Sequence, residues 1–144
     1  MILQIDESTL KSIQSHGEKA YPDEGAGLLL GEDEGEARQI RAIYTLNNSR
    51  EDSARHNRYL LTPQDYWAGE QEAARQGWDV VGVFHSHPDH PSQPSDFDRE
   101  WAIPWFSYMI TSIEKGHASN TRSWHLVDDR SRFEEDTIKV VRKG

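Results

Sequence analysis

Two histidines separated by one residue stand in the run His85-Ser86-His87-Pro88, and an acidic residue, Asp98, follows a proline-rich segment. Residues i and i+2 of an extended strand project from the same face about 7 Å apart, so both imidazoles can reach one metal ion. A catalytic zinc ion usually takes three protein ligands and leaves its fourth position to a water molecule, whose pKa falls to about 7. The spacing therefore predicts a hydrolytic zinc site built from His85, His87 and Asp98.

The same residues also have plain structural interpretations. A His-x-His pair beside prolines is commonly the exposed end of a loop. The run Ser95-Asp96-Phe97-Asp98 fits the capping box that begins many helices, and by itself it needs no other function. A strand end, a tight loop and a helix start in succession is, however, a common way to build a three-ligand site. The two motifs together therefore favour the metal site.

The segments before this motif are expected to form two helices and three strands. The first helix is predicted over residues 8–20 with Ser8 as its N-cap, and the second begins at Thr62 and Pro63 and ends at Gly77. Strands are expected over residues 25–31 and 36–44, paired as a hairpin, and over residues 59–61. Residues 46–57 are polar and predict a surface loop that borders the site.

The apolar run over residues 80–84 predicts a central strand that is covered on both faces and carries the two histidines at its end. Ser95 then begins a short helix that ends before Pro104. Three further strands are expected over residues 105–111, 122–127 and 133–141. These elements predict an α/β (α+β) fold with one mixed sheet flanked by helices.

Length, charge and composition narrow the classes of function. A chain of 144 residues suits a single domain over residues 1–144, and a formal net charge of −9 without a basic cluster argues against a nucleic-acid partner. The sequence has no cysteine, so a metal would be held by nitrogen and oxygen ligands. No long apolar stretch or signal segment is visible, so we expect a cytoplasmic protein without a membrane partner.

The pattern His85-Ser86-His87, seven residues, Ser95, two residues and Asp98 resembles the signature of the JAMM (MPN-plus) metalloproteases at every defined position. The resemblance covers about the first 110 residues, and it includes residues 21–31, Asn47 and residues 59–63. It implies the cytidine-deaminase-like JAMM/MPN fold, in which a mixed, curved sheet is flanked by helices.

The resemblance also implies a role for each matching residue. His85, His87 and Asp98 would be the ligands of one zinc ion per chain. Glu24 would be the general base for the zinc-bound water, and Ser95 would stabilise the developing oxyanion. Glu18 and Asp23 are the other carboxylates near Glu24 that could serve as this base.

The chain resembles the minimal bacterial form of the family, because it has no room for the insertions with which eukaryotic deubiquitinating members grip ubiquitin. That form acts on the C-terminal amide linkages of small ubiquitin-like sulfur carriers. The implied function is therefore zinc-dependent cleavage of a peptide, isopeptide or amide bond after a Gly-Gly end, with Asn47 as a candidate substrate contact. The family often has a small or sulfur-containing residue where this chain has Gly25-Ala26, a difference that we expect to affect packing more than mechanism.

Two alternatives use the same residues. The run from His85 to His90 also spells the His-x-His-x-Asp-His of metallo-β-lactamase-like hydrolases, which would place a second metal ion on Asp89 and His90, with His117 or His125. That fold is a larger, four-layer sandwich, and it gives no role to the residues of the capping box. The other alternative is a non-catalytic MPN scaffold subunit. Such modules typically lose a ligand or the glutamate, whereas this sequence keeps all of them.

Overall fold

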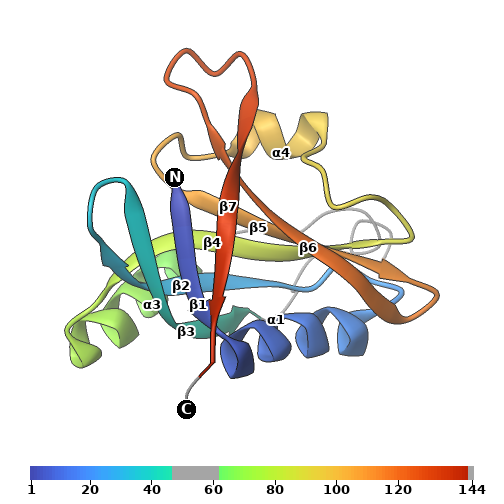
Figure 1. Cartoon of the computed structure of the whole chain (residues 1–144), viewed down its shortest axis with the longest axis horizontal. Helices are drawn as coiled ribbons and strands as arrows, with labels where there is room; N and C mark the ends of the chain where they lie inside the picture. The colour runs from blue at the N-terminus through green and yellow to red at the C-terminus, as the bar shows by residue number, and fades with distance from the viewer. Residues whose placement is uncertain (47–61, 143–144) are drawn as a thin grey trace.

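The computed structural model describes residues 1–46 and 62–142, and within them seven strands form one sheet that closes into a barrel (Figure 1). The strands follow one another around the barrel in the order β1-β3-β2-β4-β5-β6-β7. The elements are β1 (Ile2–Asp6), α1 (Glu7–Ala20), β2 (Ala26–Asp33), β3 (Ala37–Leu46), α3 (Pro63–Gln76), β4 (Asp79–Pro88), α4 (Asp96–Trp101), β5 (Ser107–Glu114), β6 (His117–Leu126) and β7 (Phe133–Val141).

The sheet is mixed, as the sequence predicts. Strand β4 pairs antiparallel with β2 and parallel with β5, and β1 pairs parallel with both β3 and β7. The hairpin between β2 and β3 is also confirmed. Strand β1 was not predicted, because five residues with only Leu3 and Ile5 buried give too short an alternation to recognise. That strand closes the sheet.

Both predicted ends of α3 are correct, whereas the predicted N-cap of α1 is wrong. Helix α3 begins at Thr62, which forms a capping box with Asp65, and it ends at Gly77 in the left-handed conformation at φ 78°. For α1 the predicted N-cap Ser8 is wrong, because β1 runs directly into the helix. The strand's last residue, Asp6, takes the capping position and accepts a hydrogen bond from the Thr9 N–H.

The hairpin of β5 and β6 differs from the prediction, and the predicted segments after residue 46 lie outside the described residues. Strands β5 and β6 form a longer hairpin than predicted, and its turn at Lys115 and Gly116 was not recognised. The predicted loop after residue 46 and the brief strand over residues 59–61 lie outside the described residues, and so does Asn47.

The core lies on both faces of the central strands. Val83 of β4 belongs to a cluster that α3 covers, and Phe84 belongs to a second cluster beneath α1, so β4 is buried on both faces as predicted. Helix α1 approaches β4 closely at Gly17, where a Cβ atom would lie 3.0 Å from the Cβ of Ser86. This close approach brings the end of α1 beside the strand that carries the two histidines.

In Figure 1, α1 and α3 are drawn at the bottom of the view and α4 at the top, and the two clusters place α1 and α3 against opposite faces of β4. None of the helices in the described ranges combines the length and the apolar character that a membrane-crossing helix needs.

Candidate metal centre

His85 and His87 lie at the carboxyl end of β4, and both are buried. Their Nε2 atoms face the carboxylate of Asp98: His85 Nε2 lies 3.4 Å from Oδ1, and His87 Nε2 lies 3.3 Å from Oδ2. Ligand atoms that are about 2.0–2.1 Å from a tetrahedral zinc ion lie about 3.3 Å from one another. Two imidazole nitrogens and a carboxylate that presents one oxygen to each of them are donors that suit a zinc ion, and the structure brings together the three residues that the sequence predicts as ligands.

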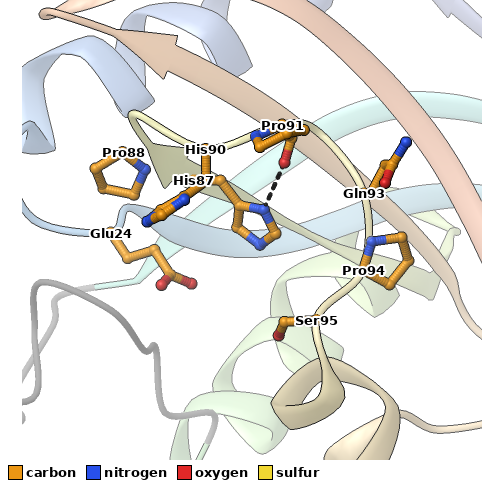
Figure 2. Close-up of a pocket in the computed structure, with 8 residues that line it drawn as sticks. All are labelled: Glu24, His87, Pro88, His90, Pro91, Gln93, Pro94 and Ser95. Carbon is orange, nitrogen blue, oxygen red and sulfur yellow. Dashed lines mark hydrogen bonds between the residues drawn. The ribbon is translucent and has the colours of Figure 1, made fainter.

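The ring of His87 is oriented by a backbone carbonyl. Its Nδ1 lies 2.9 Å from the carbonyl oxygen of Pro91, as Figure 2 shows. A carbonyl can only accept, so Nδ1 carries the proton and Nε2 keeps its lone pair for a metal ion. The proline-rich loop thus sets the tautomer of one candidate ligand. No sequence pattern marks Pro91 for this role, because the contact uses its backbone and not its side chain.

Asp98 reaches the histidines from the first turn of α4. The Ser95 N–H donates to Asp98 Oδ2 at 2.8 Å, and the Asp98 N–H donates to Ser95 Oγ at 3.1 Å, so the predicted capping box is present. The cap and the ligand position are compatible, since the same carboxylate accepts from Ser95 and faces the two imidazoles. The Ser95 hydroxyl accepts in this box and retains its own proton as a donor.

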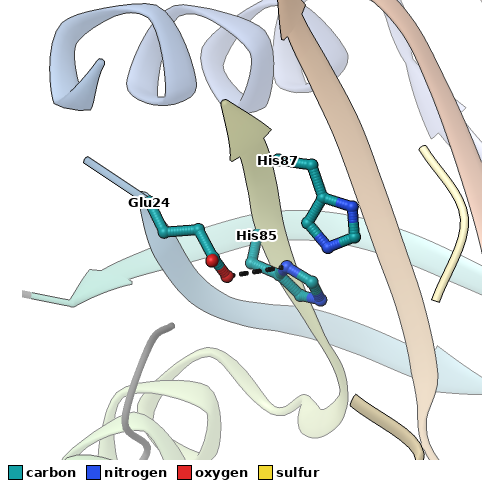
Figure 3. Close-up of side chains that lie close together, drawn as sticks. All are labelled: Glu24, His85 and His87. Atoms are coloured by element: carbon teal, nitrogen blue, oxygen red, sulfur yellow. Dashed lines mark ion pairs between the residues drawn. The ribbon is translucent and has the colours of Figure 1, made fainter. Parts of the chain in front are cut away.

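Glu24 lies between the end of α1 and the start of β2, and it is buried. Its Oε1 atom is 3.3 Å from Nδ1 of His85, as Figure 3 shows. Of the two other carboxylates considered from the sequence, Glu18 is exposed and accepts a hydrogen bond from the Ala118 N–H, and Asp23 is half-buried. The structure thus places Glu24 beside the histidines.

Glu24, His85 and His87 form a second possible donor set, because one ligand atom from each lies within 4.8 Å of the others. This set and the set with Asp98 share both histidines but use different sides of His85. We favour Asp98 as the third ligand, because its carboxylate presents one oxygen to the Nε2 atom of each histidine, at 3.4 Å from His85 and 3.3 Å from His87. Glu24 instead lies beside Nδ1 of His85, on the other side of that ring.

Ser86, which lies between the two histidines, ties Glu24 to β4. The Gly25 N–H donates to Ser86 Oγ at 2.8 Å, and the Ser86 N–H donates to the Gly25 carbonyl at 3.0 Å. No local sequence pattern marks this serine for that role. Its position between two candidate ligands was the available signal, but its partner is distant in the sequence.

Ser86→Ala is expected to lower turnover about tenfold and to leave the zinc content unchanged. The substitution leaves the buried Gly25 N–H without its hydroxyl partner, at a cost of about 1–3 kcal/mol, and allows Glu24 to move. Zinc analysis and steady-state kinetics measure the two effects. Ser12→Ala is the matched control, because that hydroxyl bonds within the exposed face of α1. Unchanged turnover, or a parallel loss of zinc, would contradict this role.

The charges of the site act on one another. Burial lowers the pKa of His85, but the nearby carboxylates of Asp98 and Glu24 offset this and hold its pKa above the ordinary value. Burial raises the pKa of Asp98, and His85 and His87 more than offset it, so the pKa of this carboxyl lies well below its usual range. The imidazolium form of His85 and the ionised form of Asp98 therefore stabilise one another.

Zinc affinity is expected to fall with decreasing pH, and the fall should begin above the pH at which an ordinary histidine titrates. A metal ligand must be deprotonated, and the raised pKa of His85 means that protons compete for it already above about pH 6.5. Competition with a chelator across this range measures the effect. An affinity that stays constant down to about pH 6 would show that His85 is not a ligand.

The site opens into a cavity of about 370 Å³ (Figure 2). It is lined by Glu24, His87, Pro88, His90, Pro91, Gln93, Pro94 and Ser95. This volume lies within the range of ordinary ligand-binding pockets, about 300–1,000 Å³. His90 is one of these lining residues, and its ring is drawn in Figure 2.

Two of the residues that would bind a second metal ion, Asp89 and His125, have other partners. The Asp89 carboxylate accepts from the Tyr21 hydroxyl at 2.6 Å and from the Lys115 N–H at 2.8 Å. His125 contacts Asp136 through Nδ1 at 2.7 Å. These contacts do not favour the dinuclear alternative, and neither does the single closed sheet.

Comparison with known proteins gives one family and several relatives. Residues 6–127 match the sequence profile of a family described as prokaryotic homologs of the JAB domain. The solution structure of a protein from Salinibacter ruber has a TM-score of 0.73 at 41% identity. The match covers 97% of this chain and 91% of the Salinibacter chain. The solution structure of a protein from Desulfitobacterium hafniense has a TM-score of 0.85 at 26% identity, with coverages of 98% and 94%.

Three named proteins are similar to this chain in sequence. A desampylase from Haloferax volcanii is 32% identical over 106 residues, which cover 70% of this chain and 73% of that protein. A CysO-cysteine peptidase from Mycobacterium tuberculosis is 27% identical over 144 residues, with coverages of 97% and 92%. Tail tip assembly protein K of Escherichia phage N15 is 28% identical over 104 residues, which cover 69% of this chain but only 37% of the phage protein.

Proposed function

This chain belongs to the prokaryotic JAB-domain family and is a metallopeptidase of the JAMM type, and we propose that it uses one zinc ion to cleave the bond after the Gly-Gly end of a ubiquitin-like sulfur-carrier protein. The observation that carries the proposal is the spacing of 3.3–3.4 Å between the two Nε2 atoms and the Asp98 carboxylate. A buried Glu24 beside these ligands adds the base that hydrolysis needs. The names of the desampylase and the CysO-cysteine peptidase support the substrate class.

In this proposal His85, His87 and Asp98 hold the metal, and the other residues of the cavity carry the proton transfers. When bound, a zinc ion would supply a Lewis acid for the scissile carbonyl and would lower the pKa of the attacking water. Glu24 takes a proton from that water and gives it to the departing amine as the amide C–N bond breaks. The Ser95 hydroxyl donates to the developing oxyanion. The products are a carboxylate at the Gly-Gly end and a free amine.

The proposal is tested by incubating the zinc-loaded protein with sulfur-carrier proteins that are extended beyond their Gly-Gly ends. Mass spectrometry should show a carrier that ends at Gly-Gly and a released leaving group. A chelator should stop the reaction, and added zinc should restore it. Carriers in which Gly-Gly is replaced by Ala-Ala are the matched control and should be cleaved poorly.

Two results would contradict the proposal in different ways. A chain that binds zinc and cleaves none of the extended carriers would favour the non-catalytic scaffold alternative. Two zinc ions per chain, measured by metal analysis, would favour the dinuclear alternative.

A further inference from the structure

Helix α4, which carries the candidate ligand Asp98, is short. It spans Asp96–Trp101, a length at which a helix gains little stability from its own hydrogen bonds. Its N-terminal end is closed by the capping box of Ser95 and Asp98. The carbonyl groups at its C-terminal end have no partners within the helix and need other donors.

Those carbonyls receive hydrogen bonds from one arginine in the turn between β6 and β7, which lies near α4 at the upper side of the sheet (Figure 1). Arg130 Nη1 donates to the carbonyl of Ala102 at 2.9 Å. Its Nη2 donates to the carbonyls of Arg99 and Glu100, each at 2.9 Å. A guanidinium at this end also interacts favourably with the partial negative charge of the helix terminus.

The turn that presents Arg130 is itself held by backbone hydrogen bonds. The Arg130 N–H donates to the Val127 carbonyl at 2.9 Å, and the Val127 N–H donates to the Arg132 carbonyl at 3.0 Å. Arg130 adopts a left-handed backbone conformation with φ at 63°, which is unfavourable for a residue with a side chain. Arg99 of the helix donates back to the Ser131 carbonyl at 3.3 Å. The turn and the helix are thus joined in both directions.

We propose that Arg130 is a positioning residue for the metal centre, whose guanidinium fixes the C-terminal end of α4 and thereby keeps Asp98 facing His85 and His87. The inference rests on the proposed function, because it takes Asp98 as a zinc ligand. Ligand distances in a metal site must be right to about 0.2 Å, so a small shift of α4 weakens binding. Tyr108 also anchors this region, since its hydroxyl accepts from the Ile103 N–H at 2.7 Å, but that contact lies after the helix. Arg130 contacts carbonyls within the last turn itself.

Two substitutions at the same position separate positioning from stability. Arg130→Ala removes the guanidinium and keeps the unfavourable backbone conformation. Arg130→Gly removes the guanidinium and relieves the backbone, because glycine adopts positive φ freely. We expect zinc affinity to fall about 10- to 100-fold in both variants, as for other groups that orient metal ligands. The glycine variant should nevertheless unfold at a higher temperature than the alanine variant.

The measurements are zinc affinity by chelator competition, thermal unfolding and the visible spectrum of the Co²⁺-substituted protein, which reports ligand geometry. Arg132→Ala is the matched control. It removes the same charge from the same hairpin, but its side chain is 67% exposed and pairs with Glu134 at the surface. It should bind zinc as the unmodified chain does. Arg130→Lys should be intermediate, because an ammonium cannot span three carbonyls as a guanidinium can.

Zinc affinity and a Co²⁺ spectrum unchanged in both Arg130 variants would overturn the inference and leave the proposed function intact. Affinity that recovers in the glycine variant along with its stability would also overturn it, because the arginine would then act through folding alone. An unmodified chain that binds no zinc would overturn the proposed function itself, and this inference with it.

Discussion

Asp98→Ala is expected to remove zinc binding and, with it, cleavage. The substitution deletes the carboxylate that faces both Nε2 atoms and leaves two ligands, fewer than the three that a catalytic zinc ion usually takes. Loss of a group that only orients a ligand through a hydrogen bond lowers metal affinity by up to roughly 100-fold. We expect the loss of zinc affinity in Asp98→Ala to be larger than this. Zinc analysis after dialysis and chelator competition measure it.

The same substitution also removes half of the capping box, so a second variant is needed to separate the two effects. Loss of the hydrogen bond from the Ser95 N–H costs about 0.5–1.5 kcal/mol of folding stability. Asp98→Asn keeps an oxygen that can accept from the Ser95 N–H, but it lacks the negative charge. It should retain the stability of α4 and still bind zinc much more weakly than the unmodified chain.

His90→Ala is the control, because His90 lines the cavity without taking part in either possible donor set. It should keep its zinc. If His90→Ala loses zinc while Asp98→Ala keeps it, the assignment of ligands is wrong.

Glu24→Gln is expected to keep zinc and to lower the rate of cleavage about 10²- to 10⁴-fold, the range for removal of a general acid–base group. Glutamine has nearly the same shape and can still hydrogen-bond with the His85 ring, but its amide cannot take a proton from water. Metal content and single-turnover kinetics on an extended carrier measure the two effects separately. Glu18→Gln, at the exposed carboxylate that bonds to Ala118, should leave both unchanged.

The outcome of this experiment also decides between the two donor sets. Loss of zinc together with activity would make Glu24 a ligand, as in the grouping of Glu24, His85 and His87 within 4.8 Å. Undiminished cleavage with zinc retained would assign the base to another residue. Asp23 is then the remaining carboxylate in this turn, and Asp23→Asn would test it.

The sequence predicts the parts of this site that depend on local spacing. The i and i+2 positions of His85 and His87 on a strand, and the capping box that carries Asp98, are visible as short patterns, and the structure brings these side chains together. The central strand and helix α3 were also predicted, because a continuous apolar run and a strong N-cap with proline are local signals.

The parts that were missed depend on contacts between distant segments. The Pro91 carbonyl acts through the backbone, so its identity as proline gives no sign of its role. Ser86 and Arg130 act on partners far away in the chain, and no local pattern marks them. The N-cap of α1 was misplaced for a related reason: β1 had not been recognised, so Asp6 was not considered as its end.

The parallel pairing of β1 with β7 has a consequence for the order in which this protein folds. Ile2 lies opposite Thr137, so the barrel closes only when the two ends of the sequence meet. Such distant pairing is slow, because the entropy of a long loop is lost before the contact forms. The segments from Glu24 to Asp98 can assemble around β4 before that step, whereas the turn with Arg130 belongs to the last hairpin. A chain still emerging from the ribosome would therefore contain every candidate zinc ligand before it contained the arginine that holds one of them in place.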